Sequence, residues 1–176
     1  MLRTADTPVL PVDPRILRFI GRHRVLTLAA ADRAGGGLWC CNLFYAYMPA
    51  SADFPDYAGG MFVFTSPETT RHAAMFTDNP NAAGSVVLES KTVGRLQGLQ
   101  FQGIVRRADI SSAMLAAARQ AYLKRFPFAA VMLSDLWVIE VTRFKYTDNT
   151  LGFGTKLHWP SANSAAAAAD REPTRA

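Results

Sequence analysis

A series of short apolar runs, each of strand length and each closed by turn residues, limits this chain to a few folds. The runs are rich in β-branched and aromatic residues, which favour strands, and glycine, proline or asparagine residues separate them. Because only three stretches carry helix signals, the strands cannot alternate with helices as a doubly wound sheet requires. We therefore expect a mainly β protein with some α (α+β), built as a barrel. The expected strands are 25–31, 38–47, 61–65, 82–88, 96–107, 136–141 and 144–147.

The helix signals are capping residues that stand before apolar faces. Asp13 followed by Pro14 is typical of a helix start, because the aspartate caps free N–H groups and proline is accepted at the first position. Ser66–Pro67–Glu68 follows the same logic, and we expect this second helix to run to about residue 76. Ser111 or Ser112 caps a third helix.

Length and composition indicate one soluble domain. The chain has 176 residues, only 19% of them charged, and no apolar stretch that could cross a bilayer. We expect a flexible arm over 1–12, the folded domain over 13–159 and a disordered, alanine-rich tail over 160–176. The adjacent cysteines Cys40 and Cys41 cannot staple distant parts of a fold, and we interpret them as small apolar strand residues in a reducing compartment. A cytoplasmic location follows, because no signal peptide is evident.

The net charge of +5 favours anionic partners, but the lysine and arginine residues are scattered. Because the cations are scattered, we expect no dedicated nucleic-acid or membrane surface, and a single phosphate ligand stays open. The segment 61–80 predicts where such a phosphate would bind, because a strand there leads directly into a helix N-terminus, whose free N–H groups attract anions. An ordinary capped helix with a solvated arginine remains the alternative. The candidate binding residues of this junction are Thr65, Ser66, Thr69, Thr70 and Arg71.

This junction resembles the phosphate-binding strand–helix junction of the pyridoxamine phosphate oxidase-like flavoproteins. The blocks LWCCNLFYAY, TRHAAM, KTVGRLQGLQFQG, ARQAYLKRFP and TDNTLGFGTKLHW are similar to the YhbP-like branch of that superfamily and span 38–159. The resemblance implies a six- to seven-stranded antiparallel split β-barrel with about three flanking helices, a homodimer, and FMN as cofactor. It also implies that Thr65 and Thr69 bond the phosphate or ribityl chain and that Arg71 binds the phosphate.

One departure from the oxidases concerns the strand that faces the flavin. The oxidases place an arginine and a lysine there, whereas the matching stretch of this chain, 41–47, has no cation and offers Asn42 as a candidate cofactor-binding residue. Losing two charge-assisted hydrogen bonds removes about 3–6 kcal/mol of gross interaction, so weak FMN binding or another anionic ligand is an open alternative. We do not expect pyridoxamine phosphate oxidation.

Three further residues complete the candidate cofactor-binding set. Gln100 faces away from the core in 99–103, where it would meet a partner's flavin or simply solvent. Lys156 follows a glycine-rich turn and offers a cation to a ring carbonyl or phosphate, and Trp159 offers a stacking ring or a core aromatic. No side chain has the pattern of a general acid or base, and the histidines have no metal-like spacing.

These features leave three functional hypotheses. The first is an FMN-dependent oxidoreductase of unknown substrate, in which the cofactor carries the chemistry. The second is a non-enzymatic flavin- or haem-binding or sensing module, with His72 as a conceivable haem ligand. Nucleic-acid binding ranks last, because no recognition motif supports it.

Overall fold

The computed structural model describes residues 11–33 and 37–160. The expected tail beyond residue 160, most of the expected arm and most of the turn at 35–37 lie outside the described residues. Val12, the last residue of the expected arm, is 7% exposed and packs into the core. The folded core therefore begins one residue before the expected domain start, at Val12.

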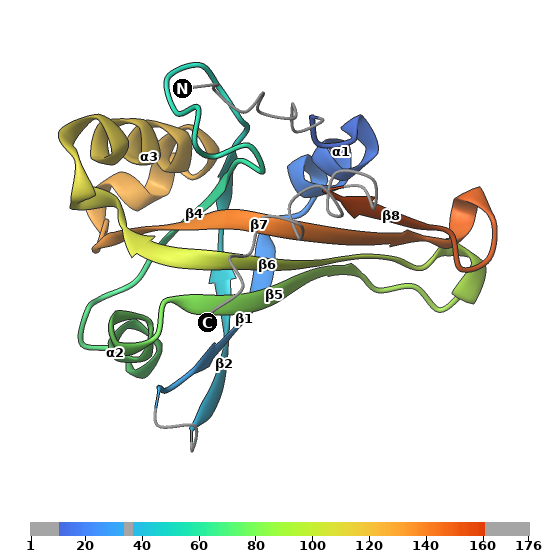
Figure 1. Ribbon diagram of the computed structural model, residues 1–176, viewed down its shortest axis with the longest axis horizontal. Coiled ribbons are helices and arrows are strands. Elements are labelled where there is room, and N and C mark those ends of the chain that lie inside the picture. The colour runs from blue at the N-terminus through green and yellow to red at the C-terminus, as the bar shows by residue number, and fades with distance from the viewer. Residues whose placement is uncertain (1–10, 34–36, 161–176) are drawn as a thin grey trace, which may run out of the picture.

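One curled antiparallel sheet forms the body of the molecule (Figure 1). Seven strands follow the order β2-β1-β5-β6-β7-β4-β3, and the short β8 pairs with β7. The expected split-barrel architecture with three flanking helices is confirmed. The strands are β1 (Val25–Ala31), β2 (Leu38–Phe44), β3 (Ala46–Met48), β4 (Met61–Thr65), β5 (Asn81–Leu88), β6 (Gln97–Arg107), β7 (Leu136–Asp148) and β8 (Lys156–Trp159).

Two strand boundaries differ from the prediction. The runs 136–141 and 144–147 form one long strand, β7, because a bulge at Thr142 lets the chain continue without breaking its pairing with β6. Gly103 opposes this bulge, and a Cβ there would lie 2.5 Å from the carbonyl oxygen of Glu140. Conversely, the run 38–47 is divided at Tyr45, whose backbone N–H donates to Arg24 and whose hydroxyl donates to Ile20.

The three α-helices are α1 (Pro14–Arg22), α2 (Arg71–Asp78) and α3 (Ser112–Arg125). Asp13 caps α1 and Ser111 caps α3, as predicted. The start of α2 was predicted too early: Thr70 is its cap, and the preceding residues form a turn. Short 3-10 turns lie at η1 (Val93–Arg95), η2 (Ala108–Ile110), η3 (Pro127–Val131) and η4 (Asn149–Leu151). Within the described ranges no helix combines the length and apolar character needed to cross a bilayer.

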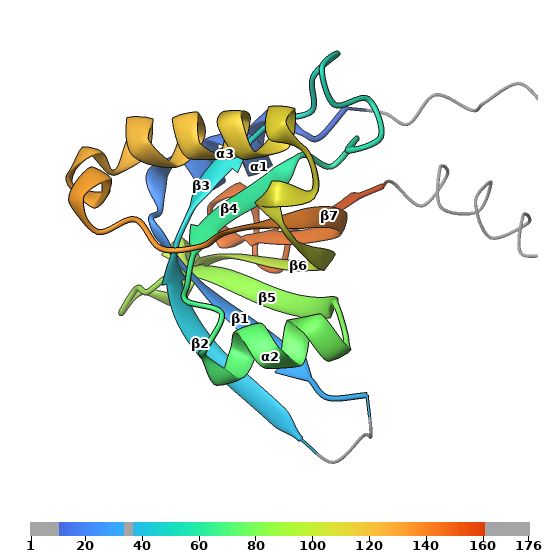
Figure 2. The ribbon, with the colours of Figure 1, turned by 90° about the vertical axis from the view of Figure 1, so that its left-hand side faces the viewer.

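Two apolar cores lie on opposite faces of the sheet (Figure 2). The larger core fills the barrel and is closed by α1 and by the Ala73–Phe76 face of α2. The smaller core lies under α3, over β3, β4 and the first half of β7. The strand β4 contributes to both, because Phe62 and Phe64 point into the barrel while Met61 and Val63 point toward α3.

Candidate functional site: the β4–α2 junction

The turn between β4 and α2 begins as a continuation of the sheet. The backbone N–H of Ser66 donates to the carbonyl of Asp135 at 3.0 Å, and the indole N–H of Trp137 donates to the carbonyl of Ser66 at 3.0 Å. These bonds extend the pairing of β4 with β7 by one residue, so Ser66 belongs to the sheet and does not cap the helix. Thr70 takes that role instead, and its hydroxyl oxygen accepts from the N–H of Ala73.

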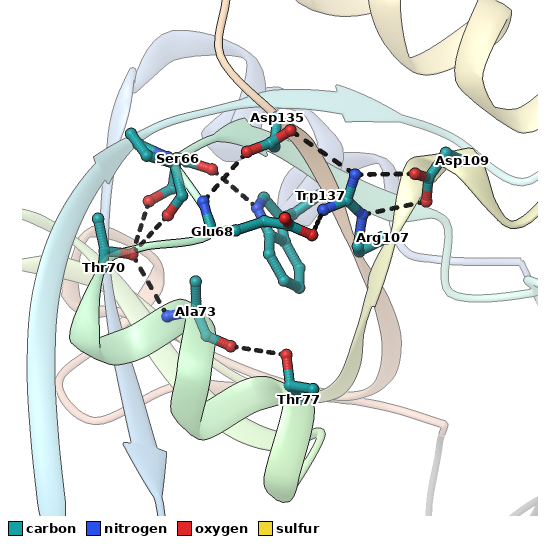
Figure 3. Close-up of polar contacts among 10 residues, drawn as sticks. Ser66, Glu68, Thr70, Ala73, Thr77, Arg107, Asp109, Asp135 and Trp137 are labelled. Atoms are coloured by element: carbon teal, nitrogen blue, oxygen red, sulfur yellow. Dashed lines mark hydrogen bonds and ion pairs between the residues drawn. The ribbon is translucent and has the colours of Figure 1, made fainter.

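A charged cluster braces the same turn from the side of β6 (Figure 3). The carboxylate of Asp135 accepts from the backbone N–H of Glu68 at 3.1 Å, and the guanidinium of Arg107 lies 3.6 Å from that carboxylate. Arg107 also forms a two-pronged pair with Asp109, at 3.1 and 2.8 Å, and contacts the carboxylate of Glu68. Arg107 therefore balances the acidic side chains beside the start of α2, where their charge would oppose an anion.

Inside the turn, three polar side chains form a compact network. The hydroxyl oxygen of Ser66 lies 2.7 Å from Nε2 of His72 and 3.1 Å from the hydroxyl oxygen of Thr70. Nε2 of His72 also lies 3.2 Å from the Thr70 hydroxyl. Burial lowers the pKa of His72, because desolvation disfavours the charged imidazolium. Ser66 is only 4% exposed, and its hydroxyl is engaged in this network.

The groups that could bind an anion lie on the outside of the same turn. The backbone N–H groups of Arg71 and His72, the first two helical residues, have no acceptor among the described residues, as is usual at a helix start. Arg71 is exposed, and its guanidinium carbon lies 4.6 Å from the ring centroid of Trp39 on β2. Thr69 is exposed, whereas the hydroxyl oxygen of Thr65 is shielded and has no hydrogen-bond partner in the described part of the chain.

Two other candidates, Asn42 and Gln100, lie on the outer face of the sheet. Strand pairing places them in one row of residues that crosses six strands. Asn42 accepts from the Thr27 hydroxyl at 2.8 Å, and Gln100 lines a hollow of about 500 Å³ with Lys145 and His158. The row runs Asn42, Thr27, Ser85, Gln100, Lys145, His158.

The two remaining candidates lie apart from the junction. Lys156 begins β8, where it is exposed and paired with Thr147. Trp159 is 5% exposed and packs against Phe144 in the barrel core, 6.0 Å between ring centroids, so its place is that of a core aromatic. Among the described residues, no hydrogen bond joins the junction to Asn42, Gln100 or Lys156.

Sequence reasoning missed the residues that support the junction. Arg107, Asp135 and Trp137 are far from the junction in sequence, and only the pairing of β6, β7 and β4 brings them to it. Trp39 carried only a weak signal, since an aromatic residue is common in a strand and its contact with Arg71 arises only on folding.

The curled antiparallel sheet with its three flanking helices defines the class of split-barrel proteins. No family model matches the sequence. The chain is 40% identical over 144 residues to a UPF0306 protein of Citrobacter koseri, covering 82% of this chain and 90% of that one. It is 39% identical over 142 residues to the UPF0306 protein YhbP of a Salmonella strain, covering 81% and 88%. The chain belongs to the UPF0306 family, and the predicted YhbP-like assignment is confirmed.

Solved structures share the fold at low sequence identity. A haem-binding protein from Mycobacterium smegmatis superposes with a TM-score of 0.64 at 23% identity, covering 86% of this chain and 58% of that chain. An FAD-binding protein from Mesorhizobium loti superposes with a TM-score of 0.56 at 14% identity, covering 74% and 87%. At these identities the likeness concerns the fold.

Proposed function

We propose that this protein binds FMN with the phosphate at the β4–α2 junction. The observation that carries the proposal is the combination of free N–H groups at the start of α2 with the exposed guanidinium of Arg71 on the same turn. Backbone N–H groups and an arginine fork are the usual partners of a phosphate dianion. The buried Thr65 hydroxyl without a partner is a further donor that a phosphate or ribityl oxygen would satisfy after a small local shift.

The edge of β2 is the proposed place for the flavin ring. β2 ends the path of the sheet, so the backbone groups on one of its edges form no ladder with another strand of the described chain. β2 also contacts α2 and β4, which puts this edge beside the junction. The flavin ring carries hydrogen-bond donors and acceptors, so it can pair with the backbone groups of this edge. Such pairing needs no side-chain cation, and β2 has none. We expect weaker FMN binding than two added cations would give.

Bound FMN would supply hydride or electron transfer, and we propose a flavin-dependent oxidoreductase whose substrate is open. The residues of this chain would bind the phosphate, orient the ring and keep water from one side of it. The Nε2 atom of His72 is engaged by two hydroxyls, so we assign it to support of the turn and not to proton transfer. A protein that only stores or senses flavin would use the same residues without turnover.

We further propose that two copies share each site. Asn42, Gln100 and Lys156 lie on the outer face, away from the junction of their own chain. A second copy packed on that face would bring them to the flavin of the first. The centre of this face carries small residues such as Ala29 and Ala83, which allow two sheets to approach closely.

Haem is the second candidate ligand, and one observation favours it. His158 is exposed in the outer-face hollow beside Arg143 and Lys145, a combination that could ligate iron and pair with propionates. His72 is less suited, because ligation would break its bonds to Ser66 and Thr70.

An absorbance titration tests the ligand. We expect purified protein to retain FMN after gel filtration, with flavin bands co-eluting, and the Arg71→Ala variant to bind FMN about tenfold more weakly or worse. The matched control is Arg119→Ala, an exposed arginine on α3. Unchanged affinity in Arg71→Ala would remove this residue from the site, and a Soret band on adding haem with no FMN retained would favour the second candidate.

A separate assay distinguishes an enzyme from a binding module. The FMN-loaded protein is mixed with NADH or NADPH under air, and reduced nicotinamide is followed by its absorbance. Steady consumption above the rate of free FMN supports an oxidoreductase. Binding without consumption of either donor supports a storage or sensing role.

A further inference from the structure

We propose that Trp39 is a positioning residue of the junction, which holds the guanidinium of Arg71 ready for a phosphate. This inference rests on the proposed function and adds to it a residue on β2, a strand that carries no cation. It assigns to β2 an indirect part in phosphate binding.

The geometry follows from strand register. Trp39 pairs with Ala30, which is 2% exposed, so both side chains point to the face of the sheet that α2 covers. Arg71 is the first residue of α2, and its guanidinium carbon lies 4.6 Å from the centroid of the Trp39 ring. This distance is within the range of a cation–π contact. The contact therefore joins the start of α2 to the edge strand β2.

The contact leaves the binding groups of the arginine available. A guanidinium that stacks on an aromatic ring uses its flat face, and its N–H groups still point outward in the plane. Among the described residues no carboxylate pairs with Arg71, so no ion pair competes with a phosphate. Fixing the long side chain before binding reduces the ordering cost that a ligand must otherwise offset.

Trp39 itself is unsuited to be the main platform for a ligand ring. It is 42% exposed, but the guanidinium already covers one face of the indole. The contact thus fits a role in holding Arg71 for the phosphate better than direct stacking of Trp39 on the ligand ring. The two roles predict different effects on the binding of ligands with and without a phosphate. A positioning residue affects only ligands that carry the phosphate, whereas a stacking residue affects every flavin.

The test compares FMN with riboflavin, which lacks the phosphate, in the full-length protein. We expect Trp39→Leu to weaken FMN binding about two- to fivefold, the range that an exposed cation–π contact is worth, and to leave riboflavin binding unchanged. Trp39→Phe should retain part of the FMN affinity. In an Arg71→Ala background, Trp39→Leu should cause no further loss, because the arginine through which it acts is gone. Phe128→Leu, at an exposed aromatic of η3, is the matched control.

Results other than these would overturn either the positioning role of Trp39 or the proposed function itself. Equal losses for FMN and riboflavin in Trp39→Leu would make Trp39 a stacking residue and overturn the positioning role. The positioning role would also be overturned if Trp39→Leu weakened FMN binding as much in the Arg71→Ala background as in the wild type. Wild-type protein that binds neither flavin would overturn the proposed function, and this inference with it. Unchanged melting temperatures of the variants establish that the fold is intact.

Discussion

The polar residues of the β4–α2 junction depend on one neutral histidine. His72 offers Nε2 to the hydroxyls of Ser66 and Thr70, and burial keeps its pKa below the ordinary value. Protonation would place a charge in a desolvated position and remove an acceptor from the network. The unfolded chain binds this proton more readily than the folded chain, so acidification below about pH 6.5 must lower stability.

Acid melting of the wild type and His72→Gln measures this effect. We expect the melting temperature of the wild type to fall between pH 7 and pH 5, and the fall to be smaller in His72→Gln, which has no proton to take up. The fall should not vanish, because burial and two neighbouring arginines also lower the pKa of His23. His158→Gln, at an exposed histidine, is the control. Equal falls in wild type and His72→Gln would contradict the assigned role of His72.

Most elements could be predicted because their signals are local. Apolar runs bounded by turn residues marked β1 and β6, and capping by Asp13 and Ser111 marked two helices. The start of α2 escaped prediction because a tertiary bond, from the indole of Trp137, decides where Ser66 belongs. Of the candidate site, the sequence predicted the junction, because one continuous segment of the chain forms the junction.

The other half of the candidate site, and the support of the first, depend on contacts between distant segments. Arg107 is at the end of β6, yet its partners Glu68 and Asp135 come from the α2 turn and from the residue before β7. No local sequence pattern predicts that these three residues come into contact. The brace appears only once β6, β7 and β4 lie side by side.

The Arg107 brace has a measurable consequence for α2 and its turn. We expect Arg107→Ala to speed amide hydrogen exchange over 66–70 and to weaken FMN binding, because Asp135 and Glu68 lose the cation that balances them. Arg106→Ala is the matched control: its side chain is exposed and pairs with Glu140 at 3.5 Å, away from the turn. If the two variants exchange at the same rate over 66–70, the brace does not hold the turn.

At the scale of the whole molecule, the two faces of the sheet are covered unequally. Helices α1 and α2 close the barrel and α3 covers β3 and β4, whereas no helix of the described residues lies over the outer face of β2, β1, β5 and β8. Apolar side chains are left open there, among them Leu38 at 82% and Val87 at 63% exposed. An open sheet face of this kind is typical of an interface. We expect a second copy to cover it.

A single charge at the centre of that face tests the assembly. Ala83 pairs with Ala29 on one side and with Gln102 on the other, so Ala83→Arg places a long cation where two sheets would have to meet. We expect wild-type protein to be a dimer by light scattering at micromolar concentration, and Ala83→Arg to be a monomer that binds FMN more weakly. The control Ala116→Arg adds the same charge on the exposed side of α3 and should stay dimeric. A monomeric wild type would contradict the shared site, and a monomeric variant with full FMN affinity would assign the flavin to one chain alone.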